Sequence, residues 1–334
     1  QALTKKPVDI ANYPFCTIDP NVGVVQVPDE RVQKLAALFQ SKKVIPAVVE
    51  FVDIAGLVKG ASKGEGLGNQ FLSYIRETAA IVQVVRCFED PDIIHVEQSV
   101  DPVRDIDTVN TELLLKDMET VEKRLGTMEK EVKGGDKLAI INYPILQEFK
   151  VVLEKGTSAF LYQKEHPEAK NVFKELQLLS AKPVIYLCNT DQKEIPEVLK
   201  KKIEELHSSY VILSAREELD IVSLSEQEVL ELGLSSRLPA LIQKAYEILS
   251  LITFFTTGAD ETRAWTIEKR MTAPQAGGVI HSDFEKTFIR AEVIPWEILL
   301  EAGGYVRAYE KGQVRTEGKE YVVQDGDVVE IKHS

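Results

Sequence analysis

The sequence changes from a strand pattern to a loop pattern within Phe51-Val52-Asp53-Ile54-Ala55-Gly56. Residues 47–52 form a short, nearly continuous apolar run that is rich in β-branched side chains. Such a run is typical of a strand that is buried on both faces of a parallel sheet. Similar runs occupy residues 80–85, 183–187 and 210–213, with helical or loop sequence between them. This alternation predicts an α/β fold with a doubly wound, mostly parallel sheet.

Polar residues close three of these runs. Asp53 follows the first run, Asn189 the third and Ser214 the fourth. Because ligands of open α/β sheets bind outside the carboxyl ends of the strands, we expect the three side chains to share one site. Ordinary turn chemistry is the alternative for any one of them, since Asp, Asn and Ser are common in turns. Their occurrence at three strand ends favours a shared site.

A long insertion separates the second strand run from the third. Its first apolar stripe has spacings of four and three residues, which are typical of a packed helical seam. The members of this stripe are Leu114, Met118, Val121, Leu125, Met128 and Val132. After a break at Gly134-Gly135, a second stripe contains Leu138, Ile141, Ile145, Phe149 and Val152. We therefore predict an antiparallel helical hairpin, whose stripes pack against each other rather than bind a partner.

The pattern changes again near Thr253. Strand-like segments follow at residues 264–267, 288–294 and 321–323, and Asp325-Gly326 is a turn signal before a last strand. Helix is expected only in a short stretch near Trp296–Leu300. The C-terminal part is therefore predicted to be a separate small α+β domain, and residues 237–251 to form the last helix before it.

Composition narrows the range of functions. The formal net charge of -13 argues against a chain that coats nucleic acid through bulk positive charge, although a local basic face is compatible with it. No apolar run reaches transmembrane length, and no signal-peptide pattern opens the sequence, so we expect no membrane partner. Cys16, Cys87 and Cys188 lack metal-ligand spacing, and we expect free thiols in a reducing cytoplasm.

Asp53 and Gly56 form a D-x-x-G motif directly after a strand. In nucleoside triphosphatases of the P-loop type, an Asp at this place holds Mg²⁺, and the Gly backbone N–H contacts the γ-phosphate. Five glycines follow within residues 56–68, which excludes a stable helix or strand there. This segment is either a flexible surface loop or a switch loop that the γ-phosphate orders. A phosphate cradle is disfavoured, because the G-x-x-x-x-G-K-[ST] spacing is absent.

Two further segments point to a nucleotide base. Asn189-Thr190-Asp191-Gln192 occupies the place of the N-K-x-D motif of guanine-binding proteins, but position four lacks the carboxylate that guanine requires. Guanine specificity is therefore not supported, and adenine, whose edge has a different order of donors and acceptors, becomes a candidate base. Ser214-Ala215-Arg216 matches the loop that contacts a base through backbone N–H groups. Upstream, Thr17 lies in a turn-rich segment, either as a turn residue or as a switch threonine.

At this point the sequence resembles the Obg-like ATPase (YchF) family of P-loop GTPase-related proteins. The resemblance covers nearly the whole chain. The stretches that carry it are residues 12–18, 51–61, 64–69, 85–88, 263–267, 273–276 and 281–286. It implies a P-loop-type nucleotide-binding domain at 1–105 and 178–252, a helical-hairpin (coiled-coil) insertion at 106–177 and a TGS-like domain at 253–334. It also implies a cytoplasmic, Mg²⁺-dependent switch protein that hydrolyses ATP in preference to GTP and associates with ribosomes; we expect a monomer.

The resemblance assigns roles residue by residue. Thr17 and Asp53 match the Mg²⁺ ligands, and Gly56 matches the γ-phosphate contact. The residues that match nucleotide-binding positions beyond the D-x-x-G motif are Asn189, Thr190, Ser214 and Ala215. Leu57 stands where many GTPases have a water-orienting Gln, and His95 matches a family histidine proposed to position the water. The alternative for His95 is a buried loop histidine.

The chain departs from the family pattern at two places. Gln192 stands where the family has Glu, which puts the details of adenine recognition in question. No Walker A motif occurs in the sequence, and the resemblance places this motif immediately before Gln1. We expect the intact protein to carry it, because the ATPase function depends on that phosphate cradle.

A second function from a different class is an RNA- or ribosome-binding adaptor, in which the nucleotide-binding fold is mainly a scaffold. The residues that favour it are Arg263, Trp265, Lys286, Arg290 and Arg307. The alternative is that Trp265 belongs to the core and that the cationic groups are solvated.

Overall fold

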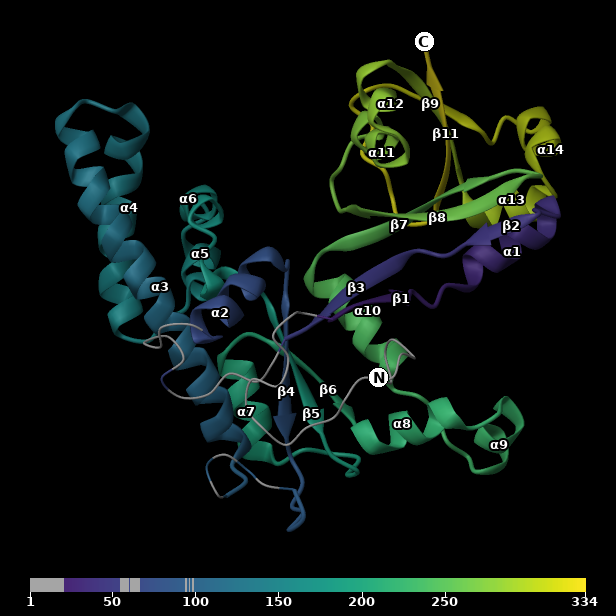
Figure 1. Cartoon of the computed structure of the whole chain (residues 1–334). Helices are drawn as coiled ribbons and strands as arrows, with labels where there is room; N and C mark the ends of the chain where they lie inside the picture. The colour runs from purple at the N-terminus through teal and green to yellow at the C-terminus, as the bar shows by residue number, and fades with distance from the viewer. Residues whose placement is uncertain (1–20, 55–59, 61–66, 94, 96, 98) are drawn as a thin grey trace. The chain divides into compact units, whose positions relative to one another are not determined.

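The structure is a computed structural model that describes residues 21–54, 60, 67–93, 95, 97 and 99–334. The described residues form two compact units. One unit contains residues 52–244 and the described residues up to Gly23; the other contains residues 24–51 and 245–334. Figure 1 labels the helices and strands of both units. Residues 24–51 thus group with the C-terminal part of the chain, and the domain boundaries implied by the resemblance stay a prediction.

The first unit is built on parallel strands, as the sequence predicts. Strands β4 (Ile81–Arg86), β5 (Val184–Asn189) and β6 (Ser209–Leu213) pair in the order β4-β5-β6. Both pairings are parallel, with Val85 opposite Cys188 and Asn189 opposite Leu213. These strands cover the apolar runs at 80–85, 183–187 and 210–213, which confirms the predicted α/β class with its parallel sheet (Figure 1).

The fourth predicted strand has a different partner from the one expected. Strand β3 (Val48–Asp53) pairs with β1 (Asn21–Gln26), and among the described strands it does not join the β4-β5-β6 sheet. The expectation that Asp53 ends a strand of the same sheet as Asn189 and Ser214 is therefore wrong for the pairing seen here. Strand β1, a segment that the sequence patterns did not reveal as a strand, pairs with one edge of β3, and no other described strand pairs with the second edge. The expectation that Asp53, Asn189 and Ser214 share one site stays a prediction.

Helices cover the parallel sheet. The first turns of α3 (Pro102–Lys133) and helix α7 (Glu197–Glu205) contribute Ile106, Leu199 and Ile203 to a buried cluster with Tyr186 and Cys188 of β5. The other helices of this unit are α2 (Leu67–Glu77), α8 (Ala215–Ser223), α9 (Glu226–Glu231) and α10 (Leu238–Ile248). Helix α10 confirms the helix predicted near 237–251. In the described part of the chain, Cys87 and Cys188 are free cysteines, as expected; Cys16 lies outside it.

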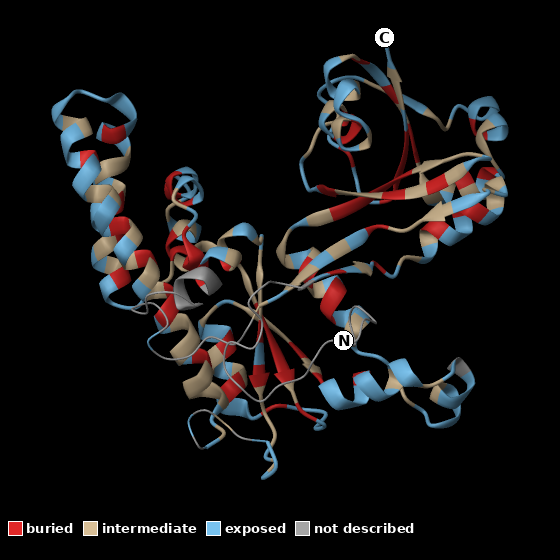
Figure 2. Cartoon of the chain, in the orientation of Figure 1, coloured by how far each residue is buried: buried red, intermediate tan, exposed pale blue. Residues whose placement is uncertain are grey.

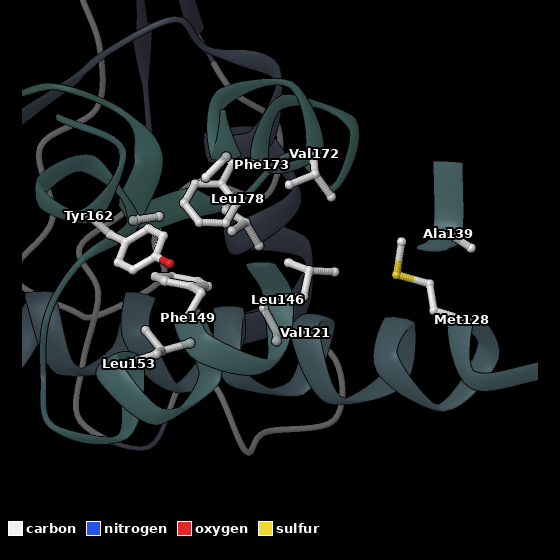
Figure 3. Close-up of a cluster of buried hydrophobic side chains, with 12 residues drawn as sticks. Val121, Met128, Ala139, Leu146, Phe149, Leu153, Tyr162, Val172, Phe173 and Leu178 are labelled. Atoms are coloured by element: carbon white, nitrogen blue, oxygen red, sulfur yellow. The ribbon is translucent and has the colours of Figure 1, made fainter. Parts of the chain in front are cut away.

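The insertion forms the predicted hairpin. Helix α3 packs against α4 (Lys137–Glu154), and α5 (Ala159–Glu165), α6 (Ala169–Glu175) and the short η2 (Leu179–Ala181) complete it. Figure 3 shows its core, in which the rings of Phe149 and Phe173 lie 4.4 Å apart. All members of the first predicted stripe belong to this core or pack against it. The second stripe is wrong at Leu138 and Ile141, which are 71% and 60% exposed, because Ala139 and Leu146 face the core instead. Figure 2 shows buried and exposed residues interspersed along the hairpin helices α3 and α4.

The second unit is a mixed sheet in the order β10-β9-β11-β7-β8-β2. Its strands are β2 (Lys43–Ile45), β7 (Leu251–Thr257), β8 (Glu261–Glu268), β9 (Phe288–Pro295), β10 (Arg315–Glu317) and β11 (Asp327–His333). Its helices are α1 (Glu30–Phe39), α11 (Ala273–Ile280), α12 (Ser282–Lys286), α13 (Trp296–Ala302) and α14 (Tyr305–Glu310). Strand β2 pairs with β8 in parallel, and α1 packs on β7 and β8.

Two expectations for this unit are corrected. Helix is not confined to the stretch near Trp296, since α11, α12 and α14 are helices as well. Residues 321–323 do not form a strand, because only Val322 makes an isolated bridge, to Thr272. The turn at Asp325-Gly326 is confirmed. None of the helices in the described ranges is both long and apolar enough to span a bilayer.

Asp325 and Gly326 join several elements of the second unit. The Asp325 carboxylate accepts the backbone N–H of Thr253 at 2.9 Å and pairs with the Arg31 guanidinium at 2.6 Å. Gly326 donates its N–H to the Thr253 carbonyl at 2.8 Å and accepts the N–H of Trp296 at 3.0 Å. The turn therefore ties α1, β7 and α13 together.

Candidate functional site

The ends of β5 and β6 are joined through Asn189. The backbone N–H of Ala215 donates a 2.9 Å hydrogen bond to Oδ1 of Asn189. The carbonyl of Asn189 also accepts the N–H of Cys87 at 2.9 Å, so its main chain is fixed from the β4 side. Two segments that the sequence assigns to base recognition, residues 189–192 and 214–216, are thereby held together at the carboxyl edge of the sheet.

Thr190 fixes the turn that follows β5. It is almost fully buried, and its N–H donates to the carbonyl of Leu213 at 3.0 Å. Its Oγ1 accepts the N–H of Gln192 at 3.2 Å, which closes a local side-chain turn. Asp191 and Gln192 are left exposed at the edge of the sheet. The backbone of this turn is therefore set before any ligand arrives.

Ser214 caps the helix that leaves β6. Its Oγ accepts the N–H of Glu217 at 3.3 Å, so α8 begins at Ala215. The buried carboxylate of Glu218 accepts the Ser236 hydroxyl at 2.7 Å and also the backbone N–H of Arg237. The start of α8 is thus anchored to the chain that leads into α10, and the first N–H groups of α8 lie beside Asn189.

His95 is held at both ring nitrogens. Its Nε2 lies 2.9 Å from Oδ2 of Asp105, and its Nδ1 accepts the N–H of Glu97 at 3.1 Å. A nitrogen that accepts an N–H carries no proton, so Nε2 is the protonated nitrogen and donates to Asp105. Asp105 lies in the first turn of α3 and also pairs with Arg104 at 3.2 Å. His95 is part-buried, and the sheet end at Asn189 is not among its hydrogen-bond partners.

The loop before His95 is fixed by Arg86, the last residue of β4. Its guanidinium donates to the carbonyls of Phe88 at 3.1 Å, Asp90 at 3.1 Å and Ile93 at 2.9 Å. It also lies over the Phe88 ring at 4.7 Å. One side chain thus satisfies three loop carbonyls, and this shapes the approach of the chain to His95.

The metal-binding part of the prediction rests on Asp53. Its carboxylate is exposed at the end of β3. Thr17 and Gly56, the other predicted ligand and the predicted phosphate contact, lie outside the described residues. Within the described ranges no group of three or more His, Cys, Asp or Glu residues could hold a metal. Mg²⁺ bound to a nucleotide needs only one or two carboxylates, because phosphates and water complete its shell, so Asp53 fits that role.

The glycine-rich segment is described at Gly60. Its backbone adopts the left-handed conformation, with φ of +87°. Its N–H donates a 2.7 Å hydrogen bond to Oε1 of Glu112, a buried residue of α3. This contact joins the segment that follows the D-x-x-G motif to the helical hairpin.

Trp265 belongs to the packing of the C-terminal unit. It packs against that unit's buried core, its ring stacks on Phe254, and its Nε1 donates to Thr256 at 2.9 Å. The guanidinium of Arg263 lies over the Trp265 ring, 3.8 Å from its centroid. Trp265 therefore has a structural role, and this weakens the argument for an adaptor based on it.

Comparison with known proteins identifies the family. The model of the 50S ribosome-binding GTPase family matches residues 1–130, and the C-terminal model of YchF GTPases, described as a protein of unknown function, matches residues 251–334. The ribosome-binding ATPase YchF of Bacillus subtilis is 48% identical, with 99% of this chain and 94% of the relative covered. The chain belongs to the YchF family. The ribosome-binding ATPase YchF of Haemophilus influenzae is 44% identical over 99% of this chain and 94% of its own length.

A solved structure extends the likeness to the fold. The structure of the Schizosaccharomyces pombe YchF GTPase matches with a TM-score of 0.77 and 39% identity. The match covers 99% of this chain and 93% of that one. The chain therefore shares the fold of that YchF structure over nearly its whole length.

Sequence reasoning assigned no role to three residues whose contacts shape the surroundings of the candidate site: Arg86, Asp105 and Glu112. Each acts through a contact to a backbone or side chain that is distant in sequence or lies in a loop. No sequence signal marked Glu112 or Asp105. Arg86 lies in residues 85–88, one of the stretches that carry the family resemblance, but its contacts to the loop carbonyls could not be read from the sequence.

Proposed function

We propose that this chain is a nucleotide-dependent switch that binds and hydrolyses ATP, with ATP preferred over GTP. The observation that carries the proposal is the 48% and 44% identity, over 99% of the chain, to proteins named ribosome-binding ATPases. The functional protein is a Mg²⁺-dependent, monomeric, cytoplasmic ATPase that associates with ribosomes. Residues 1–105 and 178–252 form its nucleotide-binding domain, residues 106–177 its hairpin insertion and residues 253–334 its TGS-like domain.

The base is bound at the edge where β5 and β6 end. Asn189 and Thr190 lie on one side of this edge, and Ser214 and Ala215 on the other. The 2.9 Å bond from Ala215 to Asn189 supports this assignment, because it fixes both segments in one place. Gln192 supplies an amide in place of the carboxylate that would accept the N1–H of guanine, and this favours adenine.

Asp53 and Thr17 hold Mg²⁺, and the backbone N–H of Gly56 contacts the γ-phosphate. Magnesium supplies charge neutralisation between the phosphates when it is bound. The side chain of Leu57 has no polar atom that could orient the attacking water. We assign the orientation of the water to His95, a role in which its Nδ1 exchanges the N–H of Glu97 for the water, while Asp105 keeps the proton on Nε2.

The test uses the full-length protein with fluorescent analogues of ATP and GTP, with and without Mg²⁺. We expect ATP to bind at least about tenfold more tightly than GTP, which corresponds to about 1.4 kcal/mol. Slow, Mg²⁺-dependent phosphate release should accompany binding. Absence of adenine-nucleotide binding by the full-length protein would refute the proposal.

Association with ribosomes is tested separately by co-sedimentation with and without ATP. We expect the amount of bound protein to depend on the nucleotide, and Asp53→Ala to remove that dependence. If ribosome association is independent of nucleotide and survives Asp53→Ala, the adaptor function replaces the switch.

A further inference from the structure

Glu112 is a buried acid in the middle of the long helix α3. It is 4% exposed, and its Oε1 atom accepts the backbone N–H of Gly60 at 2.7 Å. Carboxylates are rarely buried unless a partner compensates the loss of water. A hydrogen bond from a backbone N–H to a carboxylate is among the stronger kinds, about twice as strong as one between neutral groups. The Gly60 contact therefore contributes to the stability of this carboxyl group in its buried position.

The position of Gly60 makes this contact relevant to the site. Gly60 follows the D-x-x-G motif by four residues and precedes α2. Its φ of +87° is a conformation that side-chain-bearing residues rarely adopt. The backbone at this point thus has a defined turn, and the N–H that the turn presents is directed at Glu112.

Helix α2, at the other end of the same segment, also rests on α3. Leu72 and Ile75 of α2 form a buried cluster with Leu113 of α3 and Leu179 of η2. The Arg76 guanidinium lies 3.4 Å from the Thr120 hydroxyl of α3. Helix α3 therefore contacts Gly60 through Glu112, and it contacts α2 through Leu113 and Thr120.

We propose that Glu112 is a positioning residue for hydrolysis, which fixes Gly60 and thereby couples the glycine-rich segment to the helical hairpin. Glu112 acts through Gly60 and does not contact the nucleotide. The inference rests on the proposed ATPase function. It adds that helix α3 of the hairpin responds to the glycine-rich segment that follows the D-x-x-G motif. A change in the backbone at Gly60 alters a hydrogen bond of a buried carboxyl group in α3, so a change at one is felt at the other.

The experiment compares the full-length wild type with Glu112→Met and Glu112→Gln. Methionine fills a similar volume without a carboxylate, whereas glutamine keeps an oxygen acceptor for the Gly60 N–H. Glu119→Gln is the matched control, because Glu119 is an exposed acid of the same helix that pairs with Lys116. Amide hydrogen exchange of peptides that cover Gly60 is measured without nucleotide, and kcat and KM for ATP are measured in parallel.

In Glu112→Met we expect exchange at Gly60 to accelerate at least about tenfold, because a charge-assisted hydrogen bond is lost. We expect kcat to fall about tenfold while KM stays within about twofold, since binding contacts remain and only positioning is lost. Glu112→Gln should keep most of the wild-type protection from exchange at Gly60 and most of the wild-type kcat. Glu119→Gln should match the wild type in both quantities. This pattern supports the proposal.

Unchanged exchange at Gly60 in a folded Glu112→Met protein would overturn it, as would an unchanged kcat despite faster exchange. Equal loss of kcat in the Met and Gln variants would also overturn it, because it would indicate a general structural role. If Glu112→Met does not fold, Glu112→Gln and Glu112→Ala are compared by the same two readouts. A wild-type protein without ATP hydrolysis refutes the proposed function, whereas exchange at Gly60 still decides the Glu112 contact.

Discussion

The Nε2 atom of His95 lies 2.9 Å from the Oδ2 atom of Asp105, across the junction between the loop after β4 and helix α3. The acid comes from the first turn of α3. The helix that forms one arm of the hairpin therefore also sets the tautomer and the orientation of His95. The proposed role of His95 can therefore be tested by substitution of either residue of this pair.

His95→Ala should lower kcat for ATP by about a hundredfold or more, because a positioned histidine contributes about 10²–10⁴-fold in proton-transfer chemistry. The Kd for ATP should stay within about twofold. Asp105→Ala should lower kcat by less, about tenfold, since the histidine remains but is no longer oriented. Single-turnover hydrolysis and nucleotide titration measure the two quantities. His207→Asn is the control, because His207 is an exposed histidine with a φ of 50° that Asn tolerates. An unchanged single-turnover rate in His95→Ala would exclude the role.

Asn189→Ala should weaken ATP and GTP binding together. The variant removes the Oδ1 acceptor of the Ala215 N–H, so the start of α8 loses its link to the end of β5. We expect about a tenfold increase in both Kd values and a loss of about 1 kcal/mol in the free energy of unfolding. Asp191→Ala, at an exposed position of the same turn, is the matched control for stability. Tight ATP binding by Asn189→Ala would show that this edge of the sheet does not hold the base.

Asp117→Asn should change how stability depends on pH. Burial raises the pKa of Asp117 to about 6, although it accepts the N–H groups of Leu179 and Ser180 at 2.7 Å each. In the unfolded chain this carboxyl titrates near 3.8. The folded state therefore binds the proton more tightly, and the stabilisation that the protonated form gives below about pH 4 is lost as the pH rises through about 6.

We expect the wild type to lose up to about 3 kcal/mol of unfolding free energy between pH 4 and pH 7 relative to Asp117→Asn. Asp117→Asn removes one hydrogen-bond acceptor, so we expect a lower unfolding free energy at every pH. Because asparagine does not titrate, this free energy should not change with pH through residue 117. Urea unfolding at four pH values measures the difference. Asp107→Asn, an acid of α3 that is 51% exposed and pairs with Lys202, is the control. Parallel pH profiles for the wild type and Asp117→Asn would contradict the prediction.

Gly326→Ala should destabilise the C-terminal unit. The φ of Gly326 is +88°, and an added Cβ would lie 2.7 Å from Cδ1 of Trp296. The left-handed backbone and the overpacking together should cost about 3 kcal/mol, seen as a lower Tm in calorimetry. Gly318→Ala is the matched control, because no heavy atom of the described residues lies within 4 Å of its Cβ position and its φ is not positive. Equal Tm values for the two variants would show that the turn adapts.

Features of this fold that depend on local patterns were predictable from the sequence. The apolar runs gave β4, β5 and β6 almost to the residue, and the stripe from Leu114 to Val132 gave the packed side of α3. Asn189 and Ser214 could be placed together because parallel strands end at a common edge. In each case neighbouring residues along the chain carry the information.

Features that depend on distant partners were not predictable. Helix α11 contains Gly277 and Gly278, which lower intrinsic helix propensity. The structure explains both glycines, since a Cβ on Gly277 would meet Phe284 and Ile331, and one on Gly278 would lie 2.8 Å from Glu285. Close packing of α12 and β11 thus overrides local preference. The partner of β3 and the contact between Glu112 and Gly60 depend on tertiary pairing in the same way.

The pairing of β2 with β8 has a consequence for the time at which this protein can fold. Lys42 and Asp260, which form an ion pair beside these strands, are 218 residues apart. At synthesis rates of roughly 5–20 residues per second, β2 and α1 leave the ribosome some ten to forty seconds before β8. During that interval Val32 and Leu35, which are buried in the finished protein, have no sheet to cover them. The nascent chain must therefore carry an exposed amphipathic segment through most of its own translation.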